Sequence, residues 1–215
     1  MTNPAGSLDE QFGAIDIYLF DQLLRGRITK GQRILDAGCG HGRNLVYFLR
    51  EGYAVYGLDA DAGAVAAVRR LAKALAPGTP EERFRHEPLE STSFEDACAE
   101  VVISSAVLHF ARDDAHFRTL LETQWRLLAP GGLFFCRLAS SIGLEPRLLT
   151  ALGNGRFHLP DGSDRYLVNA AMLAAFEDEL AATPLDPLKT TVVGELRCMT
   201  TWVLRKSGLP LSSPA

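Results

Sequence analysis

Several features are scarce in this sequence, and each absence narrows what the chain can be. Only four of its 215 residues are cysteine, without a CxxC pair or zinc-ligand spacing, which favours reduced cysteines over a disulfide scaffold. No apolar run approaches the ~20 residues of a membrane helix. The N-terminus lacks the basic and apolar regions of a secretory signal. We therefore expect a cytoplasmic protein without membrane contact.

An excess of positive charge is also missing. The chain has 22 Lys and Arg against 26 Asp and Glu, for a net charge of −4, and a nucleic-acid binder needs a basic face. Hydrophobic residues make up 47% and charged residues 22%, which excludes a disordered or collagen-like chain. The length fits one domain that needs no metal or disulfide to fold.

Short apolar runs alternate with segments of helical periodicity. A helical face is expected from Leu8 to Leu23, and further helices over 43–51, 62–76, 114–128 and 166–181. Seven strand-like runs cover 31–38, 53–59, 82–89, 100–108, 133–139, 189–194 and 197–205. Alternation of this kind predicts an α/β, Rossmann-like, mostly parallel seven-stranded sheet with helices on both faces. Only a few residues join the last two runs, so these strands must form a C-terminal antiparallel hairpin.

The chain divides into three parts of one domain. Residues 1–30 are expected to form a helical cap and residues 31–139 the ligand-binding core. Residues 140–215 hold an irregular insert, the last helix and the hairpin. The insert, 140–165, exceeds the ~12–15 residues beyond which loops are usually functional or disordered. We therefore expect it to act as a lid.

The most informative segment is Ile34–Asn44, which follows the first strand and opens a helix. Its glycines, Gly38, Gly40 and Gly42, let the chain turn sharply and let a ligand approach the backbone. An acid, Asp36, precedes them at the carboxyl end of the strand, where open α/β sheets bind ligands.

The spacing of this turn disfavours a dinucleotide. Arg43 occupies the third-glycine position of the GxGxxG fingerprint, and Asp36 would place a carboxylate near the phosphates. A carboxylate there suits a cationic group, such as an ammonium. Asp59 ends the second strand 23 positions after Asp36, about the offset at which an acid reaches ribose hydroxyls. The alternative role of Asp59 is a helix N-cap, for which Asp61 is better placed.

Together, DxGxGxG at Asp36–Gly42, then Asp59, then "LLAPGGLFF" resemble the motifs of class I S-adenosylmethionine-dependent methyltransferases. The resemblance runs from Gly31 to Ala139. Within that family, "LDAGCGHGRNLVYFLREGYAVYGLD" looks most like the tellurite-resistance subgroup.

The resemblance implies S-adenosylmethionine as cofactor, with S-adenosylhomocysteine as product, and it implies roles for single residues. Asp36 would hold the methionine ammonium and Asp59 both ribose hydroxyls. The implied cofactor-binding residues are Asp36, Gly38, Cys39, Gly40, Gly42, Asn44, Asp59, Ala60, Leu89, Glu90 and Ser104.

One position departs from the family pattern. Pro88 stands where an acid usually holds the adenine amino group. Backbone groups of Leu89 are one replacement, and the side chains of Glu87 or Glu90 are another.

The sequence offers one candidate catalytic residue, His109 in "SSAVLHF" after the fourth strand, with a packed imidazole as the alternative. His109 and His116 lie seven apart, unlike the i, i+4 pair of a helical metal site, so no metal is expected.

The sequence says least about the molecule that accepts the methyl group. Methyl transfer needs a general base only where the nucleophile must lose a proton, so we favour a small soft nucleophile such as tellurite, selenite or a thiol. The alternatives are a metabolite O- or N-methyltransferase, an NAD-dependent oxidoreductase, and a binding module without turnover. Candidate acceptor-pocket residues are Tyr18, Arg43, Phe157 and Tyr166. The oligomeric state is open.

Overall fold

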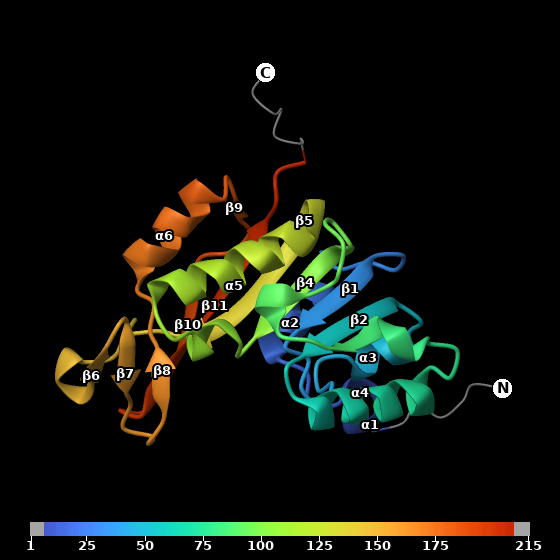
Figure 1. The fold of residues 1–215 in the computed structure, drawn as a ribbon, viewed down its shortest axis with the longest axis horizontal. Coiled ribbons are helices and arrows are strands. Elements are labelled where there is room, and N and C mark those ends of the chain that lie inside the picture. Colours follow the sequence, from blue (N-terminus) through green and yellow to red (C-terminus); the bar gives the residue numbers. More distant parts are fainter. Residues whose placement is uncertain (1–6, 209–215) are drawn as a thin grey trace.

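A computed structural model describes residues 7–208. Its helices are α1 (Leu8–Phe12), α2 (Ile17–Leu24), α3 (Val46–Arg50), α4 (Ala62–Leu75), α5 (Asp114–Leu127) and α6 (Ala170–Glu179). Short 3-10 turns are η1 (Glu81–Arg83), η2 (Leu89–Ser91), η3 (Leu108–Phe110) and η4 (Pro146–Leu148). Figure 1 shows α5 and α6 over one face of a central sheet and α3 and α4 over the other.

The central sheet has eight strands. They are β1 (Arg33–Ala37), β2 (Ala54–Asp59), β3 (Phe84–His86), β4 (Ala99–Ser105), β5 (Leu128–Ala139), β9 (Thr183–Pro184), β10 (Lys189–Val193) and β11 (Arg197–Arg205). Their order is β10-β11-β5-β4-β1-β2-β3, with β9 paired to β11. The strands β1 to β5 pair in parallel, whereas β11 runs antiparallel to β5, β9 and β10. The expected α/β sheet and its terminal hairpin are present, and the two-residue β9 is an additional strand.

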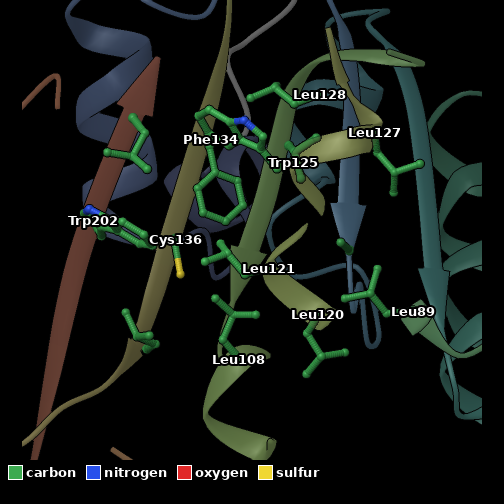
Figure 2. Packing of buried hydrophobic residues seen from close by; sticks show 14 of the residues in the cluster. Leu89, Leu108, Leu120, Leu121, Trp125, Leu127, Leu128, Phe134, Cys136 and Trp202 are labelled. Atoms are coloured by element: carbon green, nitrogen blue, oxygen red, sulfur yellow. The ribbon is translucent and has the colours of Figure 1, made fainter. Parts of the chain in front are cut away.

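Alternate residues of the central strands point to opposite faces of this sheet. One face, with α5 and α6, buries Leu35, Val102, Phe134 and Trp202. The other, with α3 and α4, buries Ile34, Val101, Phe135 and Val203. Figure 2 shows Trp125, Phe134 and Trp202 on the first face, where ring centroids of successive pairs lie 6.2 Å apart. Burial on both sides explains why these strands are continuous apolar runs.

The N-terminal helix expected from Leu8 to Leu23 is two helices, so that prediction was wrong. Gly13, with a positive φ of 59°, ends α1, and the side chain of Asp16 caps α2 by accepting from the Tyr18 N–H. Leu8 is 75% exposed, so the apolar spacing at this end does not mark a buried face.

The insert after β5 was expected to be irregular and instead forms a second sheet. Its antiparallel strands are β6 (Thr150–Gly153), β7 (Arg156–His158) and β8 (Asp164–Tyr166). Figure 1 shows this small sheet at the end of the molecule away from α3 and α4. The strands are three or four residues long and mostly exposed, so they leave no apolar alternation in the sequence. The last helix starts at Ala170 instead of Tyr166 because Tyr166 belongs to β8.

No helix within residues 7–208 combines the length and apolar character needed to cross a membrane.

Candidate active site

The glycine-rich turn follows β1, leads into α3 and is hydrogen-bonded to the carboxyl end of β2. The N–H groups of Gly38 and Cys39 both donate to the Leu58 carbonyl at 2.9 Å. Gly38 has a φ of +93°, and a Cβ added there would lie 2.5 Å from the Val107 side chain. Only glycine fits this position, since both the backbone conformation and the close approach exclude a side chain.

Asp59 fixes the second half of the turn. Its carboxylate accepts from the Gly40 N–H at 2.8 Å and from the Asp61 N–H at 2.9 Å. Each carboxylate oxygen keeps capacity for a further hydrogen bond. Asp61, in turn, caps α4 by accepting from the Gly63 N–H. Asp59 therefore positions the turn and is left able to bind a ligand.

A cavity of about 280 Å³ opens beside Asp59, and we call it the Asp59 cavity. Its walls combine carboxylates with apolar side chains, as small-molecule sites do. It is lined by Gly38, Leu58, Asp59, Ala60, Leu89, Glu90, Ala106, Val107, Phe110, His116 and Leu120. Five of the predicted cofactor-binding residues thus lie together here: Gly38, Asp59, Ala60, Leu89 and Glu90.

Asp36 is the most unusual group near the turn. It is 1% exposed, and its Oδ1 atom has no hydrogen-bond partner among the described residues. Burial raises its pKa to about 8, and the nearby Asp59 charge adds to this, while Arg43 opposes it. A buried carboxyl without a partner is costly to ionise, and an ammonium beside it would relieve that cost.

The other predicted cofactor-binding residues do not line the Asp59 cavity. Gly42 packs against α4, where an added Cβ would lie 2.8 Å from Leu71 and Val68, so it serves helix packing. Asn44 is buried and accepts from the Asp16 N–H at 3.0 Å. Cys39 and Ser104 are buried and do not line the Asp59 cavity. Gly40 also falls outside the lining residues, but the space around its Cβ position is open.

Two acids, Glu87 and Glu90, lie on either side of Pro88 after β3, and their surroundings differ. Glu87 is engaged by Thr92 and Ser93, which donate to its carboxylate from two hydroxyls and one N–H. Glu90 lines the Asp59 cavity and lies 2.6 Å from His116 Nε2. Of the two candidate replacements for the missing acid, only Glu90 faces the cavity.

A second cavity, of about 350 Å³, adjoins the first, and we call it the arginine cavity. Both cavities are lined by Ala106 and Phe110, so the two spaces are neighbours at these residues. Ala106 has a φ of +64°, a conformation that non-glycine residues seldom adopt and that is concentrated at functional sites. The arginine cavity is lined by Arg43, Ser105, Ala106, His109, Phe110, Arg137, Ala139, Leu159, Asp161, Ser163, Arg165, Arg197 and Met199.

His109 lies in the wall of the arginine cavity and is 5% exposed. Its Nδ1 accepts from the Ala139 N–H at 3.1 Å, so the neutral ring carries its proton on Nε2. Burial lowers the pKa of His109 to about 4, with Arg165 adding to the effect. The imidazole is therefore a neutral hydrogen-bond donor near pH 7, and neither nitrogen is free to accept a proton.

Three of the four residues predicted for the acceptor pocket lie elsewhere. Arg43 lines the arginine cavity. Tyr166 is 1% exposed, stacks on Phe117 and donates to Asp114, so it belongs to the packing of β8 on α5. Phe157 packs against a small apolar cluster, and the Tyr18 hydroxyl pairs with Thr191.

Several residues of the arginine cavity were not predicted from the sequence: Arg137, Leu159, Asp161, Ser163, Arg197 and Met199. Arg137 carried a readable signal, because it is the one charged residue in the buried run of β5. The others depend on how the insert and β11 fold over the sheet, which their local sequence does not reveal.

Comparison with known proteins identifies the core. The family model of the methyltransferase domain matches residues 35–136. This range includes the glycine turn, Asp59 and those residues of the arginine cavity that precede Arg137. Residues 35–136 therefore form a methyltransferase domain. A probable S-adenosylmethionine-dependent methyltransferase of Mycolicibacterium smegmatis is 30% identical over 149 residues, covering 69% of this chain and 53% of that protein. The chain spans about half the length of the curated relatives it matches.

Solved structures agree on the fold of this methyltransferase domain. A protein of Pyrococcus horikoshii aligns with a TM-score of 0.69 at 18% identity, covering 89% of each chain. The 1,6-didemethyltoxoflavin-N1-methyltransferase of Burkholderia thailandensis, solved with S-adenosylhomocysteine, aligns at 0.67 and 20% identity, covering 94% of this chain and 81% of that one. At this identity the likeness shows the fold alone.

Proposed function

We propose that this protein is an S-adenosylmethionine-dependent methyltransferase that acts on a small molecule. The observation that carries the proposal is the arrangement around the glycine turn. A partnerless buried carboxyl, Asp36, lies at one end, and Asp59 lines the adjoining cavity. Asp36 suits the ammonium group of S-adenosylmethionine, and Asp59 suits its ribose hydroxyls.

The residues present fit the donor along its length. Asp59 accepts hydrogen bonds from the two ribose hydroxyls with its remaining lone pairs. The apolar side chains of Leu58, Leu89 and Leu120 suit the flat adenine ring, and Glu90 lies in the same wall. Asp36, which burial keeps neutral below its raised pKa of about 8, ionises against the ammonium.

The donor supplies an already activated methyl group on a positively charged sulfur, so the protein contributes mainly alignment and exclusion of water. Ala106 and Phe110 line both cavities and place the acceptor against the donor. His109 donates a hydrogen bond from Nε2 and helps to orient the acceptor, instead of removing a proton from it.

The proposed acceptor is a nucleophile that needs no general base from the protein. Tellurite, selenite and thiolates meet this condition, and a metabolite O- or N-nucleophile that is already deprotonated is the alternative. The part of the chain after Ser140 contributes six of the thirteen residues on the acceptor side, among them Leu159, Arg165 and Arg197, in keeping with a lid. The described part of the N-terminal segment, residues 7–30, supports this side through the Asp16–Arg137 ion pair at 2.6 Å.

The experiment is a methyl-transfer screen with radiolabelled S-adenosylmethionine across tellurite, selenite, thiols, halides, phenols and amines. The proposal expects labelled product with at least one class. Labelled product should be absent with an Asp59→Ala variant. Hydride transfer from NADH, with no binding of S-adenosylhomocysteine, would replace the proposal by the oxidoreductase alternative.

A further inference from the structure

The arginine cavity carries an unusual excess of positive charge. Four arginines line it, and they come from separate parts of the chain: Arg43 from the glycine turn, Arg137 from β5, Arg165 from β8 and Arg197 from β11. Asp161 is the one carboxylate in the lining. Four guanidinium groups brought to one hollow repel each other unless anions compensate them.

Two of the four are compensated within the protein. Arg137 lies 2.6 Å from Asp16, whose side chain is fully buried, and Arg197 lies 3.4 Å from Asp161. Asp161 is itself held by the N–H and hydroxyl of Ser163. These pairs account for the carboxylates at the cavity.

Arg43 and Arg165 have no carboxylate partner among the ion pairs of residues 7–208. Arg43 donates to the Ser105 hydroxyl at 2.8 Å. Arg165 donates to the Asp164 carbonyl and lies over the Phe110 ring, 4.8 Å from its centroid. Asp36 is near Arg43, but its raised pKa keeps it neutral until a cation such as the donor ammonium pairs with it. Neither arginine is thus neutralised by the protein.

The cavity also has room and apolar surface for an organic body. Its volume of about 350 Å³ falls within the range of small-molecule sites, well above what a bare oxyanion fills. Phe110, Leu159 and Met199 supply apolar walls beside the two free guanidinium groups. Arginine binds carboxylates and phosphates through paired N–H donors, which gives both affinity and orientation.

We propose that the arginine cavity binds an organic anion, with its carboxylate or phosphate held by Arg43 and Arg165 and its apolar part against Phe110, Leu159 and Met199. This rests on the proposed function, since it names the class of acceptor for the same site. The anionic group fixes the acceptor so that another part, or the anion itself, meets the methyl group at Ala106 and Phe110. An uncharged molecule of the same shape leaves two guanidinium groups unpaired and binds less well.

The test is calorimetric titration of the full chain with benzoate, phenyl phosphate, benzamide and selenite, with and without S-adenosylhomocysteine. Benzoate or phenyl phosphate is expected to bind at least tenfold more tightly than benzamide and selenite. The stronger of the two anions assigns the site to carboxylic acids or to phosphate esters. Arg43→Gln and Arg165→Gln should each lower that affinity about tenfold. Arg147→Gln, at a surface arginine outside the cavity lining, should leave it unchanged.

Several results would overturn the proposal. Equal affinity for benzoate and benzamide, or unchanged affinity in both arginine variants, would show that the cavity does not select anions. Selenite binding as tightly as benzoate would show that the organic body plays no part. Circular dichroism and thermal unfolding of each variant separate loss of binding from loss of fold. Failure of S-adenosylhomocysteine to bind, with anion binding intact, would refute the proposed function and leave the anion site standing.

Discussion

At the scale of single residues, Asp59 holds the glycine turn and is the proposed ligand of the donor ribose. Asp59→Ala removes the acceptor of the Gly40 and Asp61 N–H groups and leaves two ribose hydroxyls unpaired. We expect S-adenosylhomocysteine to bind about 2–4 kcal/mol more weakly, given the cost of stranding buried polar groups. Calorimetric titration measures this loss. Asp61→Ala is the matched control, because it removes only the α4 cap, costs about 1 kcal/mol of stability and should leave affinity unchanged.

The raised pKa of Asp36 predicts that the stability of the fold depends on pH. Its ordinary pKa is 3.8, and burial raises it to about 8 in the folded protein. Between these values the folded state holds a proton that the unfolded state has lost. The stability from the neutral carboxyl is therefore complete below about pH 4 and is lost progressively as the pH rises to about 8.

Urea unfolding of the ligand-free protein and of Asp36→Asn, at several pH values between about 5 and 9, checks this expectation. Asparagine cannot ionise, so the wild type should lose stability relative to the variant as the pH rises. If the difference between the two proteins stays constant across this range, Asp36 is already ionised in the folded protein.

Gly38 and Asp59 could be singled out in the sequence because each stands at the carboxyl end of an apolar strand, β1 or β2, and both line the Asp59 cavity. Gly42 packs against α4, which arrives from later in the chain. Tyr166 stacks on Phe117 of α5 and anchors β8 there, away from both cavities. Local sequence does not encode either tertiary contact, so the sequence alone could not place these two side chains.

At the scale of elements, Gly40 in the glycine turn and Gly52 after α3 offer a matched pair of substitutions. Gly40 and Gly52 both have positive φ, at 51° and 73°, and neither has an atom within 4 Å of its Cβ position. Each change to alanine should therefore cost about 1–2 kcal/mol of stability from the left-handed backbone alone. Only Gly40→Ala places a methyl group in the turn held by Asp59, so it alone should weaken S-adenosylhomocysteine. Equal affinity in the two variants would place the donor away from this turn.

The insert gives a second prediction at this scale. Deleting Asn154–Asp161 removes β7 and takes Leu159 and Asp161 out of the arginine cavity, while no residue of the Asp59 cavity comes from this segment. The affinity for S-adenosylhomocysteine should survive and turnover should fall, measured by calorimetry and by methyl transfer to any acceptor found in the screen. Lost donor affinity with an unchanged acceptor preference would reverse the assignment of the two cavities.

The elements also show where sequence patterns are reliable. The strands β1, β4, β5 and β11 were readable because burial on both faces makes each a continuous apolar run. The strands β6 to β8 were not, because they are short, exposed and specified by their pairing with each other. The spacing of apolar residues from Leu8 to Leu23 predicted one long N-terminal helix. Gly13, with its positive φ, instead ends the first of two helices.

At the scale of the whole molecule, two neighbouring cavities lie at the carboxyl ends of the parallel strands. The Asp59 cavity is lined entirely by the matched domain, and the arginine cavity by the same edge together with the insert and β11. This division explains why five residues predicted to bind the cofactor line one cavity, whereas only Arg43 of the four predicted for the acceptor pocket lines the other. The donor side depends on a local turn, whereas the acceptor side depends on which late segments fold across the sheet edge.

The central claim is that the Asp59 cavity binds the methyl donor and not a dinucleotide. Isothermal titration calorimetry with S-adenosylhomocysteine and, separately, with NADH tests it most directly. The account predicts saturable binding of S-adenosylhomocysteine at one site per chain, weakened by Asp59→Ala, and no binding of NADH. Saturable binding of NADH without binding of S-adenosylhomocysteine would contradict it.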